Sequence, residues 1–194
     1  MTRTLAIVIF DEVEVLDFCG PFEVFSVASR FVEPDAFHVR LVAEEKRPIL
    51  TRGGMSVNPH DAIADCPRPD LLLVPGGLGA RTEMHNPILI DWIRNASPTA
   101  ELILSVCTGA LLLAKADLLD GLEATTHHSA IELLQQTAPK TNIHADRRFI
   151  DNGRVICSAG IAAGIDMSLH IVARLLGNEI AGKTARQMEY PFNG

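Results

Sequence analysis

The 194-residue sequence lacks the patterns that mark several common functional classes. Its four cysteines are widely spaced and form no C-x-x-C pair, so neither a zinc site nor a disulfide framework is indicated. Lysine and arginine form no basic block and the formal net charge is −7, so we expect no nucleic-acid partner. The histidines are scattered and no phosphate-binding glycine loop is present. We therefore expect neither a metal ion nor an organic cofactor.

Long apolar runs and internal repeats are also missing. The apolar N-terminal segment, residues 5–10, is shorter than a signal-peptide core and runs into Asp11 and Glu12. We expect no export signal and no membrane span, and unpaired thiols fit a reducing, cytoplasmic location. Without a linker or low-complexity segment, the length suits one α/β domain over residues 1–194.

What the sequence does contain is an alternation of short, β-branched apolar runs with amphipathic stretches. Buried strands are predicted over residues 5–10, 37–43, 71–74 and 101–106. Continuous hydrophobicity in these runs is typical of strands covered on both faces. The predicted fold class is α/β, a mainly parallel sheet with helices on both faces. In such folds ligands bind beyond the carboxyl ends of the strands.

Residues typical of helix starts and helix ends predict the boundaries of helices between the strands. Pro21 is expected in the first turn of one helix, and Pro87 follows the cap residue Asn86 in another. Ser129 and Glu132 predict a capping box. Further elements are expected as hairpins within residues 47–59 and 147–158, a helix over 161–176 that ends at Gly177, and a helix over 179–188.

The stretch LILSVCTGALLLA places Cys107 between a predicted strand and a predicted helix. The turn must be tight, Gly109 permits close packing there, and a nucleophile on such an elbow projects above the sheet with a strained backbone. A helix N-terminus would lower the cysteine pKa from about 8.5 to between about 3.5 and 7.5, so we expect a thiolate at neutral pH. The alternative is a buried cysteine that only fills space. That structural role is assigned to Cys19, Cys66 and Cys157.

The segment VPGG could supply hydrogen-bond donors beside Cys107. Gly76 and Gly77 end another predicted strand, and the N–H groups of Gly77 and Thr108 would form a two-donor pocket for a developing anion. The same glycines are also ordinary turn residues.

Asp17 is the candidate acid or base. It lies between apolar residues, after the first predicted strand and before its helix, and such surroundings raise the pKa of a carboxyl group. The alternative is a capping or turn aspartate. Glu12 and Glu14 are expected to be more solvated, and Glu23 in the following helix is a further candidate acid.

His127 and His128 precede a predicted helix, and an imidazole there could reach the same crevice. A cysteine–histidine pair is a plausible arrangement of nucleophile and base. The alternative is that His127 merely precedes the Ser129 cap.

Together these motifs resemble the ThiJ/PfpI superfamily of glutamine-amidotransferase-like proteins over nearly the whole chain. The segments that carry the resemblance are IVIFDEVEVLDFCGPFEVF, DLLLVPGG, SVCTGALLLAKADLLDGLEATTHH and SAGIAAGIDMSLHIVARLLG. The aspartate of LDFCGPFEVF and the Cys-Thr-Gly turn are most similar to the isonitrile hydratase branch, because other branches usually carry glutamate at the position of Asp17. The resemblance implies a flavodoxin-like, doubly wound sheet and a homodimer. It also implies that Cys107 is the nucleophile on its elbow, with Asp17 as acid partner and Thr108 beside it.

Three functions follow as hypotheses. The resemblance implies an enzyme that takes a small-molecule substrate and hydrates an isonitrile, R–N≡C, to an N-substituted formamide. The second is a stand-alone small-molecule sensor, because the ligand-binding half of AraC-type regulators shares the GPFEVF and GIDMSLH motifs. The third is a cysteine-dependent protein that acts on reactive aldehydes or senses oxidative stress. The natural substrate is left open.

Overall fold

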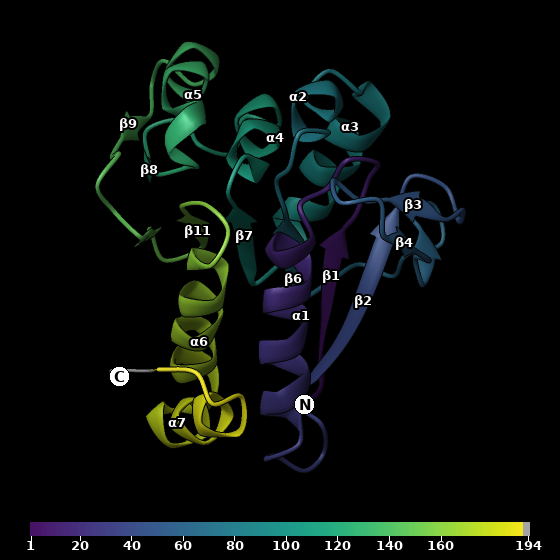
Figure 1. Cartoon of the computed structure of the whole chain (residues 1–194), viewed down its shortest axis with the longest axis vertical. Coiled ribbons are helices and arrows are strands. Elements are labelled where there is room, and N and C mark those ends of the chain that lie inside the picture. Colours follow the sequence, from purple (N-terminus) through teal and green to yellow (C-terminus); the bar gives the residue numbers. More distant parts are fainter. Residues whose placement is uncertain (192–194) are drawn as a thin grey trace.

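A seven-stranded sheet forms the centre of the described part of the chain (Figure 1), which in this computed structural model is residues 1–191. The last three residues of the predicted domain lie outside it. Neighbouring strands are parallel except for the antiparallel pair β10–β11, which confirms the predicted mainly parallel α/β sheet. In spatial order the strands are β10 (Phe149–Asp151), β11 (Val155–Ser158), β7 (Leu102–Val106), β6 (Leu71–Val74), β1 (Arg3–Val8), β2 (Phe37–Ala43) and β5 (Asp61–Ala62).

The central strands β1, β6 and β7 are buried on both faces. Every residue of β6 and β7 is buried, as are the last four residues of β1. This explains why these strands read as continuous apolar runs rather than as alternating patterns. Their carboxyl ends reach the same edge of the sheet, where the turns that follow them come together (Figure 1).

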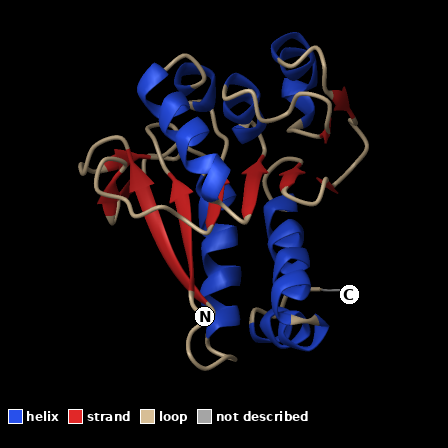
Figure 2. Cartoon of the chain, turned by 180° about the vertical axis from the view of Figure 1, so that it is seen from behind, coloured by secondary structure: helices blue, strands red, loops and turns tan. Residues whose placement is uncertain are grey.

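Helices cover both faces of the sheet, as predicted. On one face α1 (Val15–Ser29), α6 (Ala163–Leu176) and α7 (Asn178–Gln187) pack together (Figure 1). On the other face lie α3 (Pro87–Ala96) and α4 (Gly109–Lys115), seen from behind in Figure 2. The shorter helices α2 (Ala80–Glu83) and α5 (Ile131–Thr137) stand beyond the carboxyl edge, with the 3-10 turn His128–Ala130. The 3-10 turn Ser97–Thr99 lies at the opposite edge, where the chain enters β7. No helix in residues 1–191 has the length and apolar character needed to cross a membrane.

Two small additional sheets complete the architecture. The predicted hairpin around Gly53 and Gly54 forms from β3 (Ile49–Leu50) and β4 (Ser56–Val57). The predicted hairpin around Gly153 is confirmed as the β10–β11 pair. A short parallel pair, β8 (Glu123–Ala124) and β9 (Asn142–Ile143), was not predicted, because two-residue strands carry no periodic signal.

Two of the predicted helix boundaries are confirmed. Asn86 caps α3 by accepting hydrogen bonds from the N–H groups of Ile88 (3.1 Å) and Leu89 (3.4 Å), and Pro87 occupies the first helical position. Gly177 ends α6 with φ +92°, the conformation that favours glycine.

The prediction for Pro21 is wrong. Helix α1 begins at Val15, so Pro21 lies inside the helix rather than in its first turn. Pro21 has no N–H to donate to the carbonyl of Asp17, four residues earlier. The helix tolerates this loss because the segment buries Phe18 and Phe25 almost completely.

The capping box at Ser129 and Glu132 is also wrong. A 3-10 turn, His128–Ala130, precedes α5, and no side chain caps the N-terminus of α5. The Ser129 hydroxyl instead bonds the Nδ1 atom of His127 at 2.8 Å, so a neighbouring imidazole competes successfully for the capping group.

Two glycines provide a matched test of the packing behind the turn that follows β7. A Cβ at Gly109 would lie 2.0 Å from the carbonyl oxygen of Val74, whereas a Cβ at Gly182 in α7 would meet no atom within 4 Å. We predict that Gly109→Ala lowers the free energy of unfolding by about 2 kcal/mol or more through overpacking. Gly182→Ala should raise it by about 0.5–1 kcal/mol through helix propensity. Urea unfolding measures both, and equal stabilities would refute the close contact.

Candidate active site

Cys107 occupies the turn between β7 and α4. β7 ends at Val106 and α4 begins at Gly109, so only Cys107 and Thr108 connect them. Cys107 has φ +56°, in the left-handed region that residues with a side chain rarely adopt. Gly109 makes the turn possible, because any Cβ there would collide with Val74. The predicted tight turn with a strained cysteine backbone is therefore present.

Neighbouring segments hold the strained backbone in place. The Cys107 N–H donates to the carbonyl oxygens of Ser158 and Ala159, each at 3.2 Å, where β11 ends beside β7. The Cys107 carbonyl accepts a hydrogen bond from the Thr126 hydroxyl at 2.7 Å. A strained residue costs about 1–3 kcal/mol, and buried hydrogen bonds of this kind offset that cost.

The turn after β6 lies directly against the Cys107 turn. The Gly77 N–H donates to the Thr108 hydroxyl oxygen, and the same hydroxyl is within 3.0 Å of the Gly77 carbonyl oxygen as donor. The Gly76 N–H donates to Asp17 Oδ2 at 3.0 Å. Both glycine N–H groups are thus engaged within the protein. The sequence predicted two donors for an anion, the N–H groups of Gly77 and Thr108. The Gly77 N–H is bonded to Thr108, whereas the Thr108 N–H faces the Cys107 sulfur and favours the thiolate.

Asp17 is fully buried in the first turn of α1. The sequence placed it before the helix, which is wrong because α1 starts two residues earlier. Burial raises the pKa of Asp17 to about 7, an effect reinforced by the negative charge of Glu14 and opposed by hydrogen bonds from Gly76 and from the Cys107 thiol. Asp17 Oδ1 makes no hydrogen bond with any other described residue. The predicted rise in pKa is therefore confirmed.

The expectation of an acidic Cys107 thiol is overturned. The side chain is only 5% exposed, and burial followed by the negative charge of Asp17 raises the pKa of Cys107 to about 12. The Thr108 N–H acts in the opposite direction but is outweighed. Burial, which the sequence pattern does not show, therefore decides the pKa of this thiol despite its place just before α4.

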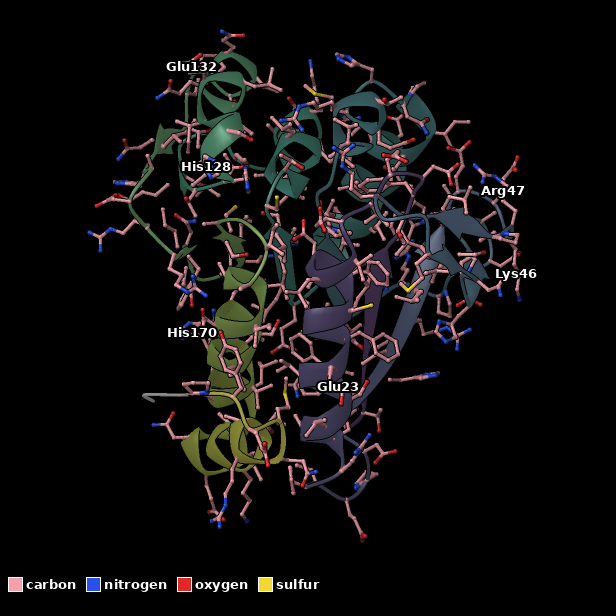
Figure 3. All side chains as sticks on the ribbon, viewed as in Figure 1. Glu23, Lys46, Arg47, His128, Glu132 and His170 are labelled. Carbon is pink, nitrogen blue, oxygen red and sulfur yellow. The ribbon has the colours of Figure 1, made fainter. Side chains whose placement is uncertain are left out.

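His127 lies near the thiol but does not pair with it. Its Nδ1 atom accepts a hydrogen bond from the Ser129 N–H at 3.3 Å, and its ring packs against Gly160, where a Cβ would lie 2.1 Å from Cδ2. No hydrogen bond joins His127 to Cys107 within residues 1–191. Burial first, and then the positive charge of neighbouring groups, lowers the pKa of His127. The exposed ring of His128 packs against it at a centroid distance of 4.2 Å and a tilt of 37° between the rings; His128 is labelled in Figure 3.

A pocket of about 370 Å³ opens above Cys107 at the carboxyl edge of the sheet. Of the predicted site residues, Gly77, Cys107, Thr108 and His127 line it. Asp17 lies beneath, buried behind the thiol. The turns after β1, β6 and β7 therefore bring the predicted residues together, as the rule for parallel sheets requires.

Six further residues line the pocket and were missed or misjudged from the sequence, among them Leu78 and Ser129. Glu14, expected to be solvated, is half-buried and lines the pocket. Arg52, Arg81 and Ile161 line it as well. The two arginines come from the β3–β4 hairpin and from α2, which carry no motif, so only the three-dimensional arrangement places them beside the cysteine. Ile161 has φ +48°, a strained backbone conformation that no sequence pattern indicates.

The remaining candidate residues lie elsewhere. Glu23 is exposed on α1, well below the carboxyl edge (Figure 3). Glu12 is exposed and pairs with Arg52 at 3.5 Å. The other cysteines are unpaired: Cys19 and Cys66 are half-buried, and Cys157 is fully buried. Within residues 1–191 no group of three or more histidine, cysteine or acidic side chains is arranged to hold a metal ion.

A doubly wound parallel sheet with a cysteine at positive φ beside a buried carboxyl group defines the class of this protein. The chain belongs to the DJ-1/PfpI family, whose model matches residues 3–174. Isonitrile hydratase from Pseudomonas putida is 33% identical over 190 residues, which cover 98% of this chain and 79% of that protein. The HTH-type transcriptional regulator CdhR from Pseudomonas aeruginosa is 32% identical over 173 residues. The match covers 89% of this chain but 51% of the regulator, so the chain spans about half its length.

Solved structures show the same fold. A ThiJ/PfpI family protein from Pseudomonas syringae superposes with a TM-score of 0.90 at 26% identity, covering 100% of this chain and 77% of the other. Drosophila melanogaster DJ-1beta superposes with a TM-score of 0.85 at 19% identity, covering 99% of this chain and 100% of the other. The flavodoxin-like fold and the family resemblance predicted from the sequence are therefore confirmed.

The buried carboxyl group predicts a pH dependence of stability. Because the pKa of Asp17 rises from 3.8 to about 7 on folding, the folded state binds the proton more tightly, and this contribution is lost as the pH rises from 4 to 7. The free energy of unfolding of the wild type should therefore fall over this pH range, and in Asp17→Asn this fall should be smaller by up to about 4 kcal/mol. Urea unfolding between pH 4 and pH 8 measures it, with the exposed Asp35→Asn variant as control. Parallel curves for Asp17→Asn and the wild type would contradict the buried, protonated carboxyl group.

Proposed function

We propose that this protein hydrates an isonitrile to an N-substituted formamide with Cys107 as nucleophile. The observation that carries the proposal is the buried Asp17 carboxyl group held beside the Cys107 thiol at the base of a small pocket. The 33% identity to an isonitrile hydratase over 98% of the chain supports the choice of reaction. No step calls on a metal ion or a cofactor.

The Asp17–Cys107 pair acts as one unit that shares a proton. With pKa values of about 7 and about 12, the pair as a whole carries a single proton above neutral pH. That proton can sit on sulfur or on the carboxyl group. Transfer from Cys107 to Asp17 creates the thiolate at the moment of attack, so a persistently acidic thiol is not required.

Addition to the isonitrile begins at its terminal carbon, which accepts a nucleophile and a proton. The Cys107 sulfur forms a bond to this carbon, and Asp17 delivers to the same carbon the proton that left the thiol. The product is a thioimidate, R–N=CH–S, attached to Cys107. Asp17 becomes a carboxylate again, ready to accept a proton.

Water completes the reaction at the same carbon. The Asp17 carboxylate takes one proton from the water as its oxygen adds, and passes that proton to the nitrogen. The resulting tetrahedral adduct, R–NH–CH(OH)–S, collapses to the formamide and expels the thiolate. The hydroxyl proton returns through Asp17 to the sulfur, and the Thr108 N–H stabilises the negative charge on the leaving sulfur.

Substitutions at the three central residues test this mechanism. Cys107→Ala should abolish turnover, and Asp17→Asn should lower kcat/KM by about 10²- to 10⁴-fold, the usual contribution of an acid–base group. His127→Ala should cost much less, because His127 is not bonded to the thiol. In the wild type kcat/KM should rise with pH to a plateau above about 7, as the pair loses its first proton.

Formamide formation from small isonitriles provides the assay, with methylglyoxal as control for the aldehyde hypothesis. Wild-type-like hydration by Asp17→Asn would refute the proton transfer. An equal loss in His127→Ala would instead point to a cysteine–histidine pair.

A sensor is the second candidate function. The 32% identity to a transcriptional regulator over 89% of this chain favours it, because a ligand-binding unit of that kind need not turn over its ligand. Binding of small molecules to the Cys107 pocket without consumption of any isonitrile would support the sensor over the enzyme.

We also propose a homodimer, as the family resemblance implies. Exposed apolar side chains lie on three adjoining segments beside the pocket: Leu16, Leu50, Met55 and Leu78, which are 38% to 56% exposed. These segments are joined by backbone hydrogen bonds between Glu12 and Leu50 and by a bridge between Val13 and Gly77. A second copy would remove this apolar surface from water.

Light scattering tests the assembly. The wild type should show a mass near twice 21.1 kDa. Leu50→Asp should shift the mass toward that of the monomer, because it places a charge on the apolar surface. Ile88→Asp is the matched control, since Ile88 is equally exposed at 56% but lies on α3. A monomeric wild type at micromolar concentration would contradict the proposal.

A further inference from the structure

The pocket above Cys107 is richer in positive charge than the rest of the chain. Arg52 and Arg81 both line it, opposite a single acidic lining residue, Glu14. The whole chain carries a formal net charge of −7, so two arginines beside one acidic lining residue are a local exception to the composition of the chain. A local excess of guanidinium groups in a concave site attracts anions.

Arg81 differs from the other half-buried arginines because it has no partner. Arg3 pairs with Glu101, Arg40 with Asp61, and Arg94 with Asp91 and Asp117. Arg81 is equally half-buried, yet it makes no ion pair and no side-chain hydrogen bond within residues 1–191. A partly desolvated guanidinium keeps its hydrogen-bonding capacity, with donors arranged to fit a carboxylate.

Arg52 is less available than Arg81. It is exposed, and its guanidinium pairs with Glu12 at 3.5 Å across the pocket rim. The charge of Arg81, in contrast, acts inside the pocket, where it adds to the effects of burial and of His128 in lowering the pKa of His127. Arg81 is therefore the principal fixed positive charge that a bound molecule would meet.

We propose that the substrate is an isonitrile that carries a carboxylate, and that Arg81 binds this carboxylate while the isonitrile carbon meets Cys107. This inference rests on the proposed hydratase function. A pocket of about 370 Å³ has room for a small aliphatic isonitrile with a carboxylate at its other end. Glu14 repels an anion, so the carboxylate is expected beside Arg81 on α2 rather than beside Glu14. A bidentate guanidinium–carboxylate pair fixes the orientation as well as the affinity.

A matched pair of substrates tests the inference in the full-length protein. Isocyanoacetate carries the carboxylate, and its methyl ester is a neutral analogue of similar size. The wild type should show a kcat/KM for isocyanoacetate at least about tenfold above that for the ester, through a lower KM. This preference should decline as the ionic strength rises.

Arg81→Gln should reduce the ratio of the two kcat/KM values by about tenfold or more, mainly through the KM for isocyanoacetate. Arg52→Gln should reduce the ratio less, because Arg52 already pairs with Glu12. The control is Arg186→Gln on α7, an exposed arginine far from the pocket, which should leave the ratio unchanged. An unchanged ratio in Arg81→Gln would overturn the inference while leaving the hydratase proposal intact.

Binding separates this inference from the proposed reaction. N-formylglycine is the product expected from isocyanoacetate, and calorimetry can measure its binding to the Cys107→Ala variant, which cannot turn over substrate. Binding that weakens about tenfold in Cys107→Ala/Arg81→Gln supports the carboxylate site, even if no isonitrile is hydrated and the hydratase proposal fails. Binding that is absent, or equal in the two variants, overturns the site.

Discussion

The reciprocal contact between Gly77 and Thr108 is the interaction on which the arrangement of the site depends. It joins the turn after β6 to the turn after β7, and the neighbouring Gly76 N–H holds Asp17 from α1. A Cβ at Gly76 would lie 2.4 Å from the Thr108 nitrogen, so only glycine allows the turns to approach this closely. Three segments that are distant in the sequence are thereby joined at the base of the pocket.

This arrangement holds the buried carboxyl group of Asp17 and the buried thiol of Cys107 side by side. Burial opposes ionisation of both groups, and the charge of Asp17 further opposes ionisation of the Cys107 thiol. In such a site one proton is shared between two acceptors at fixed positions, the Asp17 carboxylate and the Cys107 sulfur. Proton movement between carboxyl and sulfur then needs no rearrangement of solvent, which is the property an addition reaction requires from its catalyst.

The sequence predicted the architecture well because the signals for it are local. The apolar runs of β1, β2, β6 and β7, the cap at Asn86 and the stop at Gly177 each express a preference that the sheet reinforces. Pro21 and Ser129 were misread because tertiary packing overrides local preference: burial of phenylalanines extends α1 past its proline, and an imidazole takes the serine hydroxyl.

The candidate site was predicted only in part. Asp17, Cys107, Thr108 and the glycines follow strands whose carboxyl ends meet at one edge, so topology alone brings them together. The pKa of Cys107 depends on its distance from Asp17 and on its burial, neither of which is encoded in spacing. Arg81 lies on a four-residue helix with no periodic pattern, and that it forms no ion pair with residues 1–191 can be seen only in three dimensions.

The positive φ of Cys107 places a thiol side chain at a position where the backbone conformation favours glycine. In this conformation glycine is free of the steric penalty that any side chain carries, roughly 1–2 kcal/mol. For the backbone conformation alone, glycine would therefore be the preferred residue at position 107. The thiol thus stands where local preference opposes any side chain, and it is the contacts with the strands and turns around it that keep the cysteine in this conformation.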